Sequence, residues 1–338
     1  METGRNSQFV RPFRRMGREV VPALRWNAKT VEEHKAWRRR FRRKLGERVG
    51  HMPHRVPLKV RRAECVEFEK FTRRKVYIQS ERDYWVPAFL FVPKGLTAPA
   101  PAVVCLHGHS GVYPYIREGT EAEQAKCRKL DLDYAPLLAE HGYVTLALIQ
   151  RGWNETTDGL PPGDTSCHKM AIDSFLIGMT PVGLKCWDAS RALDYLETLP
   201  EVDAERIGVA GLSGGGMVAL FWPALERRVK LSMIAGYYCT FRESIFSVYH
   251  CICNCVPGLM QWGEMREIAA LIAPRPALII SGIHDPIFPI KATRRAYREL
   301  KEVYKLLGAE TSLDKDFFDG PHAWSNRKTL AFLKRHFG

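Results

Sequence analysis

Hydrophobic and polar positions follow two different patterns along this chain. In the first third, apolar and charged residues alternate over residues 65–69, 75–79 and 85–92, a pattern that predicts antiparallel strands. Further on, continuous apolar runs predict strands that are buried on both faces. These runs lie at residues 102–106, 143–149, 206–210, 230–235 and 277–281, and a last short strand is expected at 311–318.

Apolar residues with helical spacing lie between the buried strands. The expected helices lie near 133–141, through 189–199, from Gly214, through 296–307 and over 326–337. Strands that alternate with helices predict an α/β fold, with a mostly parallel central sheet and helices on both of its faces. We expect one such domain over residues 61–338. Its long irregular segments at 111–130, 152–180 and 237–265 are expected to form lid-like insertions.

Residues 1–60 are expected to be a basic, partly helical extension. Residues 1–28 show no periodicity, and we expect them to be loosely ordered. A helix is predicted from Thr30 to Gly50, because Thr30 can cap it with Glu33 as capping-box partner. The apolar face of this helix holds Trp37, Phe41 and Leu45. That face can pack on its own domain or on another subunit, so a homo-oligomer stays open.

The 338 residues carry a formal net charge of +14, which raises the question of a nucleic-acid ligand. Residues 1–62 hold 19 of the 51 Lys and Arg residues against five acidic ones, so the remaining chain is balanced. This basic arm has few aromatic residues for base stacking and no recognition motif. We therefore expect no nucleic-acid partner, and a polyanion site on the arm stays as an alternative.

Nine cysteines, an odd number, are scattered from Cys65 to Cys255. Without an apolar leader pattern, they predict a cytoplasmic protein with reduced thiols. No run of about 18 apolar residues occurs, so no membrane partner is expected. Residues 250–255, His-Cys-Ile-Cys-Asn-Cys, look like a metal site, but structural zinc takes Cys pairs from two segments. No second pair is evident beyond Cys167 and His168, so we expect no metal and no cofactor.

The strongest motif is Gly-Leu-Ser-Gly-Gly-Gly at residues 211–216. It has the pattern G-x-S-x-G between a predicted buried strand and a predicted helix, which is typical of a nucleophilic serine on a sharp turn. Ser213 is therefore the predicted nucleophile. The N–H of Gly214, at the start of the helix, is a predicted oxyanion donor.

A serine nucleophile needs a base, and after such a turn the expected chain order is Ser, then an acid, then His. Asp285 follows the buried strand near residues 277–281, and His322 follows the last predicted strand. We predict that His322 is the general base and that Asp285 orients it. The nearby residues that are less well placed for these roles are His284, Asp314, Asp316, Asp319 and His336.

The second oxyanion donor is expected in the loop after residues 102–106. Gly108 allows close backbone approach there, so the N–H of His109 is the predicted donor, and His107 is expected to form a structural hydrogen bond. Aromatic and histidine residues of the long loops are candidates for the pocket wall. The predicted substrate-binding residues are Trp153, Tyr237, His250 and Trp262.

These features resemble the α/β-hydrolase superfamily, and within it the dienelactone-hydrolase-like and acetyl-xylan-esterase-like serine esterases. The resemblance extends from about residue 60 to residue 338. Besides the triad, it is carried by residues 85–93, 107–109, 150–152, 187–196 and 272–276. Ile149 and Asn154 replace an Asp and a Gly that are common in the group, and Ser213 replaces the cysteine of dienelactone hydrolases proper.

The resemblance implies the α/β-hydrolase fold, a triad of Ser213, Asp285 and His322, and cofactor-free hydrolysis of carboxylic esters. The sequence thus predicts a serine esterase for small acyl or acetyl esters, including those on carbohydrates. Two alternatives stay open. The same triad can cleave amides or peptides, although the chain leaves no room for the large gating domain of many peptidases. The protein could instead be a polyanion-binding scaffold.

Overall fold

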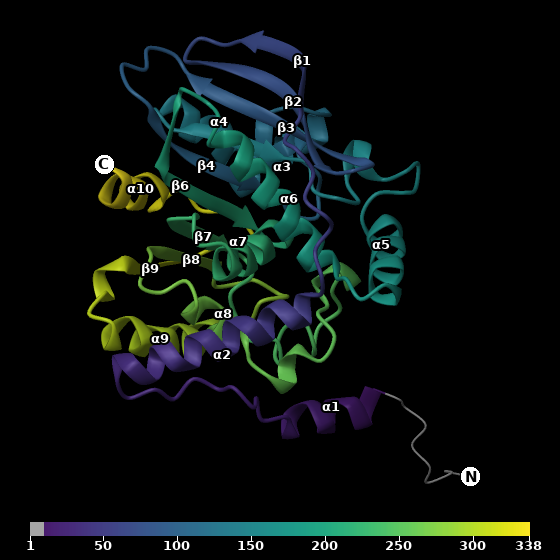
Figure 1. Ribbon diagram of the computed structural model, residues 1–338, viewed down its shortest axis with the longest axis vertical. Helices are drawn as coiled ribbons and strands as arrows, with labels where there is room; N and C mark the ends of the chain where they lie inside the picture. Colours follow the sequence, from purple (N-terminus) through teal and green to yellow (C-terminus); the bar gives the residue numbers. More distant parts are fainter. Residues whose placement is uncertain (1–9) are drawn as a thin grey trace.

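A single nine-stranded sheet runs through the centre of the computed structural model, which describes residues 10–338 (Figure 1). Its strand order is β1-β2-β3-β5-β4-β6-β7-β8-β9. The strands are β1 (Val60–Glu67), β2 (Phe71–Glu81), β3 (Tyr84–Pro93), β4 (Ala100–Leu106), β5 (Val144–Leu148), β6 (Val202–Leu212), β7 (Leu231–Ala235), β8 (Ala277–Gly282) and β9 (Leu313–Phe318). Strands β1, β2, β3 and β5 pair antiparallel in that order, and β5, β4, β6, β7, β8 and β9 pair parallel in that order.

Helices cover both faces of this sheet, as the alternating pattern predicts. They are α1 (Val10–Glu19), α2 (Val31–Val49), α3 (Glu121–Leu130), α4 (Tyr134–Glu140), α5 (Asp164–Leu176), α6 (Pro181–Leu196), α7 (Gly214–Leu225), α8 (Met265–Ala270), α9 (Ile290–Leu306) and α10 (Thr329–Phe337). Apolar residues of α2, α6, α7, α8 and α9 join one core. Residues of α4 and α10 join the core on the other face. Within residues 10–338, no helix is both long and apolar enough to cross a membrane.

The helix α2 packs on its own domain, which answers a question that the sequence left open. Thr30 caps it by accepting a hydrogen bond from the N–H of Glu33 at 3.1 Å. Its apolar face is buried and includes Trp37, Phe41 and Leu45. Two of its arginines donate to carbonyls of the core: Arg38 to Leu271 and Arg42 to Ala224. Because this face lies inside one chain, it is not available to a second subunit.

Three helices lie where the sequence analysis expected irregular or loosely ordered chain. The helix α1 occupies residues 10–19 and exposes most of its side chains, while residues 1–9 lie outside the described part. The helix α3 begins in a capping box formed by Thr120 and Glu123, a local signal without an apolar stripe behind it. The helix α5 buries small or polar side chains such as Ser166 and Ala171, which produce no hydrophobic rhythm.

The parallel strands bring four loops to one edge of the sheet. Leu106 at the end of β4 pairs with Gly211 near the end of β6, and Gly282 at the end of β8 pairs with Phe318 at the end of β9. The loops that follow these strands hold the candidate chemistry. Ligands of open α/β sheets collect at this carboxyl edge.

Candidate active site

Ser213 stands on a strained turn between β6 and α7. Its backbone angles are φ 58° and ψ −116°, which a residue with a side chain rarely adopts. Its N–H donates to the carbonyl of Ala235 at 2.9 Å, which anchors the turn to β7. The flanking glycines are required by space. A Cβ on Gly211 would lie 2.2 Å from the carbonyl oxygen of Gly215, and one on Gly215 would lie 1.9 Å from that of Leu106.

Asp285 and His322 form a directly bonded pair. Asp285 Oδ2 lies 2.6 Å from His322 Nδ1. The other oxygen of Asp285 accepts the N–H groups of Ile287 and Phe288, each at 2.9 Å. The carboxylate is buried and fully bonded, so it fixes the imidazole and leaves Nε2 as the free nitrogen. This is the geometry in which an acid orients a general base.

Close backbone approaches bring the histidine loop to the sheet edge. A Cβ on Gly282 would lie 2.0 Å from the carbonyl oxygen of Pro321, so only glycine lets the two loops touch. A Cβ on Gly236 would lie 2.8 Å from His322 Cε1. The ring of Phe288 stacks on the imidazole at 5.7 Å between centroids. The imidazole is therefore confined on several sides.

Ser213 and His322 line one cavity of about 280 Å³. The Nε2 atom of His322 is buried and has no hydrogen-bond partner among residues 10–338. A buried nitrogen without a hydrogen-bond partner is costly, so this atom is an unusual feature of the cavity. Asp285 lies behind His322, so the structure brings the three predicted triad residues together in the predicted order.

The two predicted oxyanion donors flank the serine. Gly214 is the first residue of α7, and the first N–H groups of a helix have no partner within it. A Cβ on Gly108 would lie 3.2 Å from Ser213 Cβ, so the loop after β4 reaches the nucleophile. The N–H of Gly108 donates to the hydroxyl of Tyr115 at 2.9 Å, which leaves His109 as the next N–H of that loop.

His107 has a structural place, as predicted. Its Nε2 accepts the N–H of Gln150 at 3.0 Å, and the side chain of Gln150 donates back to the carbonyl of His107. Burial lowers the pKa of His107 to about 3. The ring is therefore neutral near pH 7 and joins the ends of β4 and β5.

Of the four predicted substrate-binding residues, the structure places His250 in the cavity wall. Its Nε2 lies 3.0 Å from the hydroxyl of Ser244, and burial lowers its pKa to about 4. The other three do not line this cavity and are corrected. Trp153 packs edge-on against His109, Tyr237 is 1% exposed, and Trp262 lies beneath Lys44 of α2. These three aromatic side chains serve packing.

Several residues of the cavity wall were not predicted from the sequence pattern. They are Tyr115, Lys126, Leu130, Leu132, Asp164, Tyr249, Asn254, Ile287 and Phe288. Lys126 and Asp164 come from α3 and α5, helices that the sequence analysis did not predict. Phe288 lies three residues after Asp285, and that short spacing was a signal that could have identified it.

A cluster of sulfur and imidazole groups lies beside the cavity, and it corrects the view that residues 250–255 lack a second set of ligands. His109 Nε2 lies 3.2 Å from Cys253 Sγ. One ligand atom from each of His109, Cys167, Cys251 and Cys253 lies within 4.8 Å of all the others. The cluster is not evident from spacing along the chain, because its members come from three distant segments.

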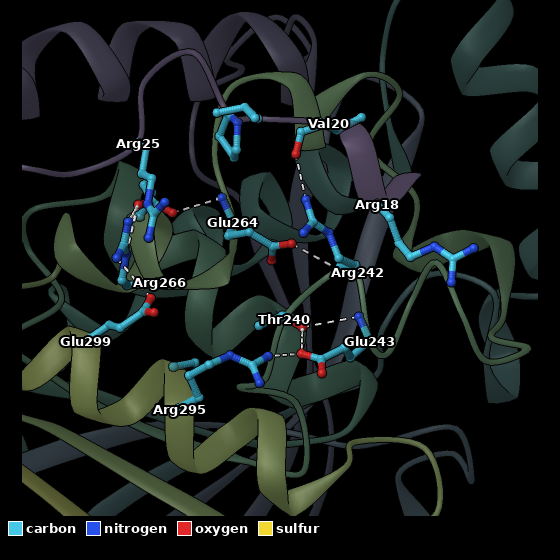
Figure 2. A pocket seen from close by; sticks show the side chains of 14 residues that line it. Arg18, Val20, Arg25, Thr240, Arg242, Glu243, Glu264, Arg266, Arg295 and Glu299 are labelled. Atoms are coloured by element: carbon cyan, nitrogen blue, oxygen red, sulfur yellow. Dashed lines mark hydrogen bonds and ion pairs between the residues drawn. The ribbon is translucent and has the colours of Figure 1, made fainter. Parts of the chain in front are cut away.

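A second cavity, of about 270 Å³, lies between the N-terminal segment, α8 and α9. Figure 2 shows that charged side chains of its wall point toward one another. Arg295 pairs with Glu243, and Arg266 pairs with Glu299 at 2.9 Å. Its lining residues include no serine, cysteine or histidine. The candidate triad residues therefore lie at the other cavity, the one at Ser213.

Comparisons with known proteins agree with this architecture. Residues 182–236 match the family model described as glucuronyl esterase of fungi. YtaP of Bacillus subtilis strain 168, whose name assigns it to the hydrolases, is 28% identical over 273 residues, which cover 79% of this chain and 88% of YtaP.

Two solved structures share the fold at low sequence identity. One, from Bacteroides fragilis, is assigned as an acetyl xylan esterase; it is 16% identical with a TM-score of 0.78, over 94% of this chain and 84% of the other. A glucuronoyl esterase from Solibacter usitatus is 17% identical with a TM-score of 0.71, over 94% of this chain and 97% of the other. The predicted α/β-hydrolase fold is confirmed.

Proposed function

We propose that this protein is a serine esterase that cleaves small acyl or acetyl esters, with esters on carbohydrates as its substrate class. The observation that carries the proposal is the bonded pair of Asp285 and His322, in which His322 lines the same cavity as Ser213 and keeps an Nε2 without a hydrogen-bond partner among residues 10–338. Nucleophile, base and orienting acid are the parts that acyl transfer through a covalent intermediate requires.

The proposed reaction proceeds in two halves. His322 Nε2 takes the proton of Ser213 as the hydroxyl attacks the ester carbonyl, and the N–H groups of Gly214 and His109 stabilise the oxyanion. His322 then protonates the departing alkoxide, which leaves an acyl group on Ser213. A water molecule that gives its proton to His322 releases the acid and restores the serine. Asp285 stabilises the imidazolium in both halves.

Two observations support a small, polar substrate. The cavity volume of about 280 Å³ lies just below the range of about 300–1,000 Å³ for small-molecule sites. The wall contains the cation Lys126 and the carboxylate Asp164, which can hydrogen-bond to hydroxyl-rich ligands. The names of similar structures, acetyl xylan esterase and glucuronoyl esterase, describe carbohydrate esters and favour the same class.

A cytoplasmic location belongs to the same proposal. The nine cysteines are all free of disulfides in the structure, including three that lie within one cluster. Thiols that persist so close together are typical of a reducing compartment.

The proposal is tested by hydrolysis of p-nitrophenyl esters from acetate to octanoate, with wild type, Ser213→Ala and Ser247→Ala in parallel. Ser247 is an exposed serine whose hydroxyl donates to the carbonyl of Arg242, so its variant is the matched control. We expect activity on the short esters that falls by several orders of magnitude only in Ser213→Ala. Equal activity of all three proteins would reject Ser213 as the nucleophile.

The amide-hydrolase alternative is separated in the same experiment. Acetylated xylo-oligosaccharides, a methyl ester of glucuronic acid and short peptide p-nitroanilides are compared at matched concentration. Turnover of the sugar esters above that of the anilides supports the proposal. Preferential turnover of the anilides would favour an amide or peptide hydrolase over the proposed esterase.

A further inference from the structure

The cluster of one imidazole and three thiols draws its members from three separate segments of the chain. His109 lies in the loop after β4, and Cys167 lies in the first turn of α5. Cys251 precedes the short 3₁₀ helix η3 (Ile252–Asn254), and Cys253 lies within it. Cys167 and Cys253 are fully buried, whereas His109 and Cys251 also line the catalytic cavity. The proposed triad uses none of these four side chains.

The distances are close to those of a tetrahedral zinc site. With Zn–S bonds of about 2.3 Å and Zn–N bonds of about 2.0 Å, ligand atoms of a tetrahedron lie about 3.5–3.8 Å apart. The four atoms here all lie within 4.8 Å of one another, and His109 Nε2 lies 3.2 Å from Cys253 Sγ. Shifts within side-chain rotamers therefore suffice to close the site around an ion.

The charge around the cluster suits three thiolates and a divalent cation. Zinc with three thiolates and one neutral imidazole carries a net charge of −1. Lys185 of α6 is 3% exposed, and Cys167, Cys251 and Cys253 are among its neighbours. A buried lysine is costly without a counter-charge. The zinc-thiolate centre supplies that counter-charge.

We propose that His109, Cys167, Cys251 and Cys253 bind one zinc ion in a closed Cys₃His site that joins the walls of the catalytic cavity. Four protein ligands leave no open position, so the ion has a structural role and takes no part in the ester chemistry. It ties α5 and the segment around η3 to the loop after β4. Under the proposed function, that loop also supplies the second oxyanion donor.

The alternative occupant of the cluster is a disulfide between two of its thiols. A disulfide would use two sulfurs and leave His109 and the third thiol unexplained, whereas a zinc ion uses all four groups. The two cases differ in the number of titratable thiols under denaturing conditions without reductant. After chelation, a zinc protein yields all nine thiols, and a disulfide-bonded protein yields two fewer.

The test measures the metal content of the full-length chain, produced without a histidine tag, by inductively coupled plasma mass spectrometry. We expect about one zinc ion per chain in the wild type. Cys167→Ser and Cys253→Ser should lose it. Cys255→Ser is the matched control, because Cys255 belongs to the same sequence cluster but is exposed and lies outside the four-residue group, and it should keep the ion.

A second measurement does not depend on whether the ligand variants fold. Wild type exchanged with cobalt(II) should show sulfur-to-metal charge-transfer absorption that the Cys255→Ser control shares. A wild type without stoichiometric metal would overturn the inference, whether nine or seven thiols are titrated. Equal metal content in Cys253→Ser and Cys255→Ser would also overturn it. Ser213→Ala should keep its zinc, so failure of the esterase proposal and failure of the metal proposal give different results.

Discussion

Ser213 shows how one residue can be held where its own backbone preference opposes it. A serine at φ 58° and ψ −116° costs on the order of 1–3 kcal/mol. The surrounding contacts hold it there: the bond to Ala235 on one side and α7 on the other. The same turn aims the hydroxyl away from the strand and places the N–H of Gly214 beside it. Strain and function thus arise from one bend.

A glycine of this turn and a glycine of α2 give a prediction that compares two substitutions by alanine. Gly215→Ala should be strongly destabilising, because its Cβ would lie 1.9 Å from the carbonyl oxygen of Leu106. Gly46→Ala in α2 meets nothing within 4 Å and should stabilise the protein by about 0.5–1 kcal/mol. Urea denaturation of both variants measures the difference. A Gly215→Ala protein as stable as wild type would contradict the described packing of the turn.

Asp285 and Asp319 permit an equally direct comparison. Asp285 bonds to His322, whereas Asp319 bonds at 2.8 Å to the exposed His284. Asp285→Asn should lower kcat for a p-nitrophenyl ester about 10⁴-fold, since the amide favours the wrong imidazole tautomer. Asp319→Asn should leave kcat close to wild type. A comparable loss in both variants would show that Asp285 is not the specific partner of the base.

At the scale of elements, α2 is a structural part of the α/β domain despite its basic composition. Its buried stripe packs in the same core as α7 and α8, and Arg38 and Arg42 bond to carbonyl groups there. Part of the positive charge of residues 1–62 thus has a structural use. This weakens the view of the whole segment as a free arm for polyanions.

The stability contribution of α2 can be measured at Phe41, which is completely buried. Phe41→Ala should cost about 3–5 kcal/mol, because the change leaves a cavity in the core. Arg40→Ala, one position away on the exposed side, should change the free energy of unfolding by less than about 0.5 kcal/mol. If chemical denaturation gives the same small value for both, α2 does not pack as described.

Local signals in the sequence were sufficient for most elements but not for all. The strands, the cap of α2 at Thr30 and the turn at Ser213 each follow from neighbours in the chain. The helix α5 was missed because its inner face is made of Ser166, Cys167 and Ala171, which carry no apolar rhythm. The group of His109, Cys167 and Cys253 depends on tertiary proximity, which spacing along a single segment cannot reveal.

At the scale of the whole molecule, buried neutral histidines make stability depend on pH. Burial, followed by the nearby charge of Arg38, lowers the pKa of His34 to about 4, and burial lowers that of His107 to about 3. Their unfolded value is about 6.5. Below that value the unfolded chain binds protons that the native state excludes, so stability falls as the pH falls.

This linkage predicts that each of these histidines lowers the free energy of unfolding by about 2 kcal/mol between about pH 6.5 and pH 5. Above about pH 7 these histidines no longer make the free energy of unfolding depend on pH. His34→Gln keeps an acceptor for the indole N–H of Trp26, which bonds to His34 Nδ1 at 3.1 Å, and should show a shallower decline. His284→Gln, at an exposed position, serves as control. Denaturant midpoints across this range that decline equally in the two variants would refute the assignment.

The last helix, α10, carries a practical consequence for handling the protein. Phe337 packs against Gly208 and its carbonyl accepts from Arg206, so α10 ends beside the start of the buried part of β6. Ser213 follows the opposite end of that strand. A surface linked through Gly338 would therefore hold the molecule with the mouth of its cavity turned toward the solution, which makes this terminus the preferred handle for immobilisation.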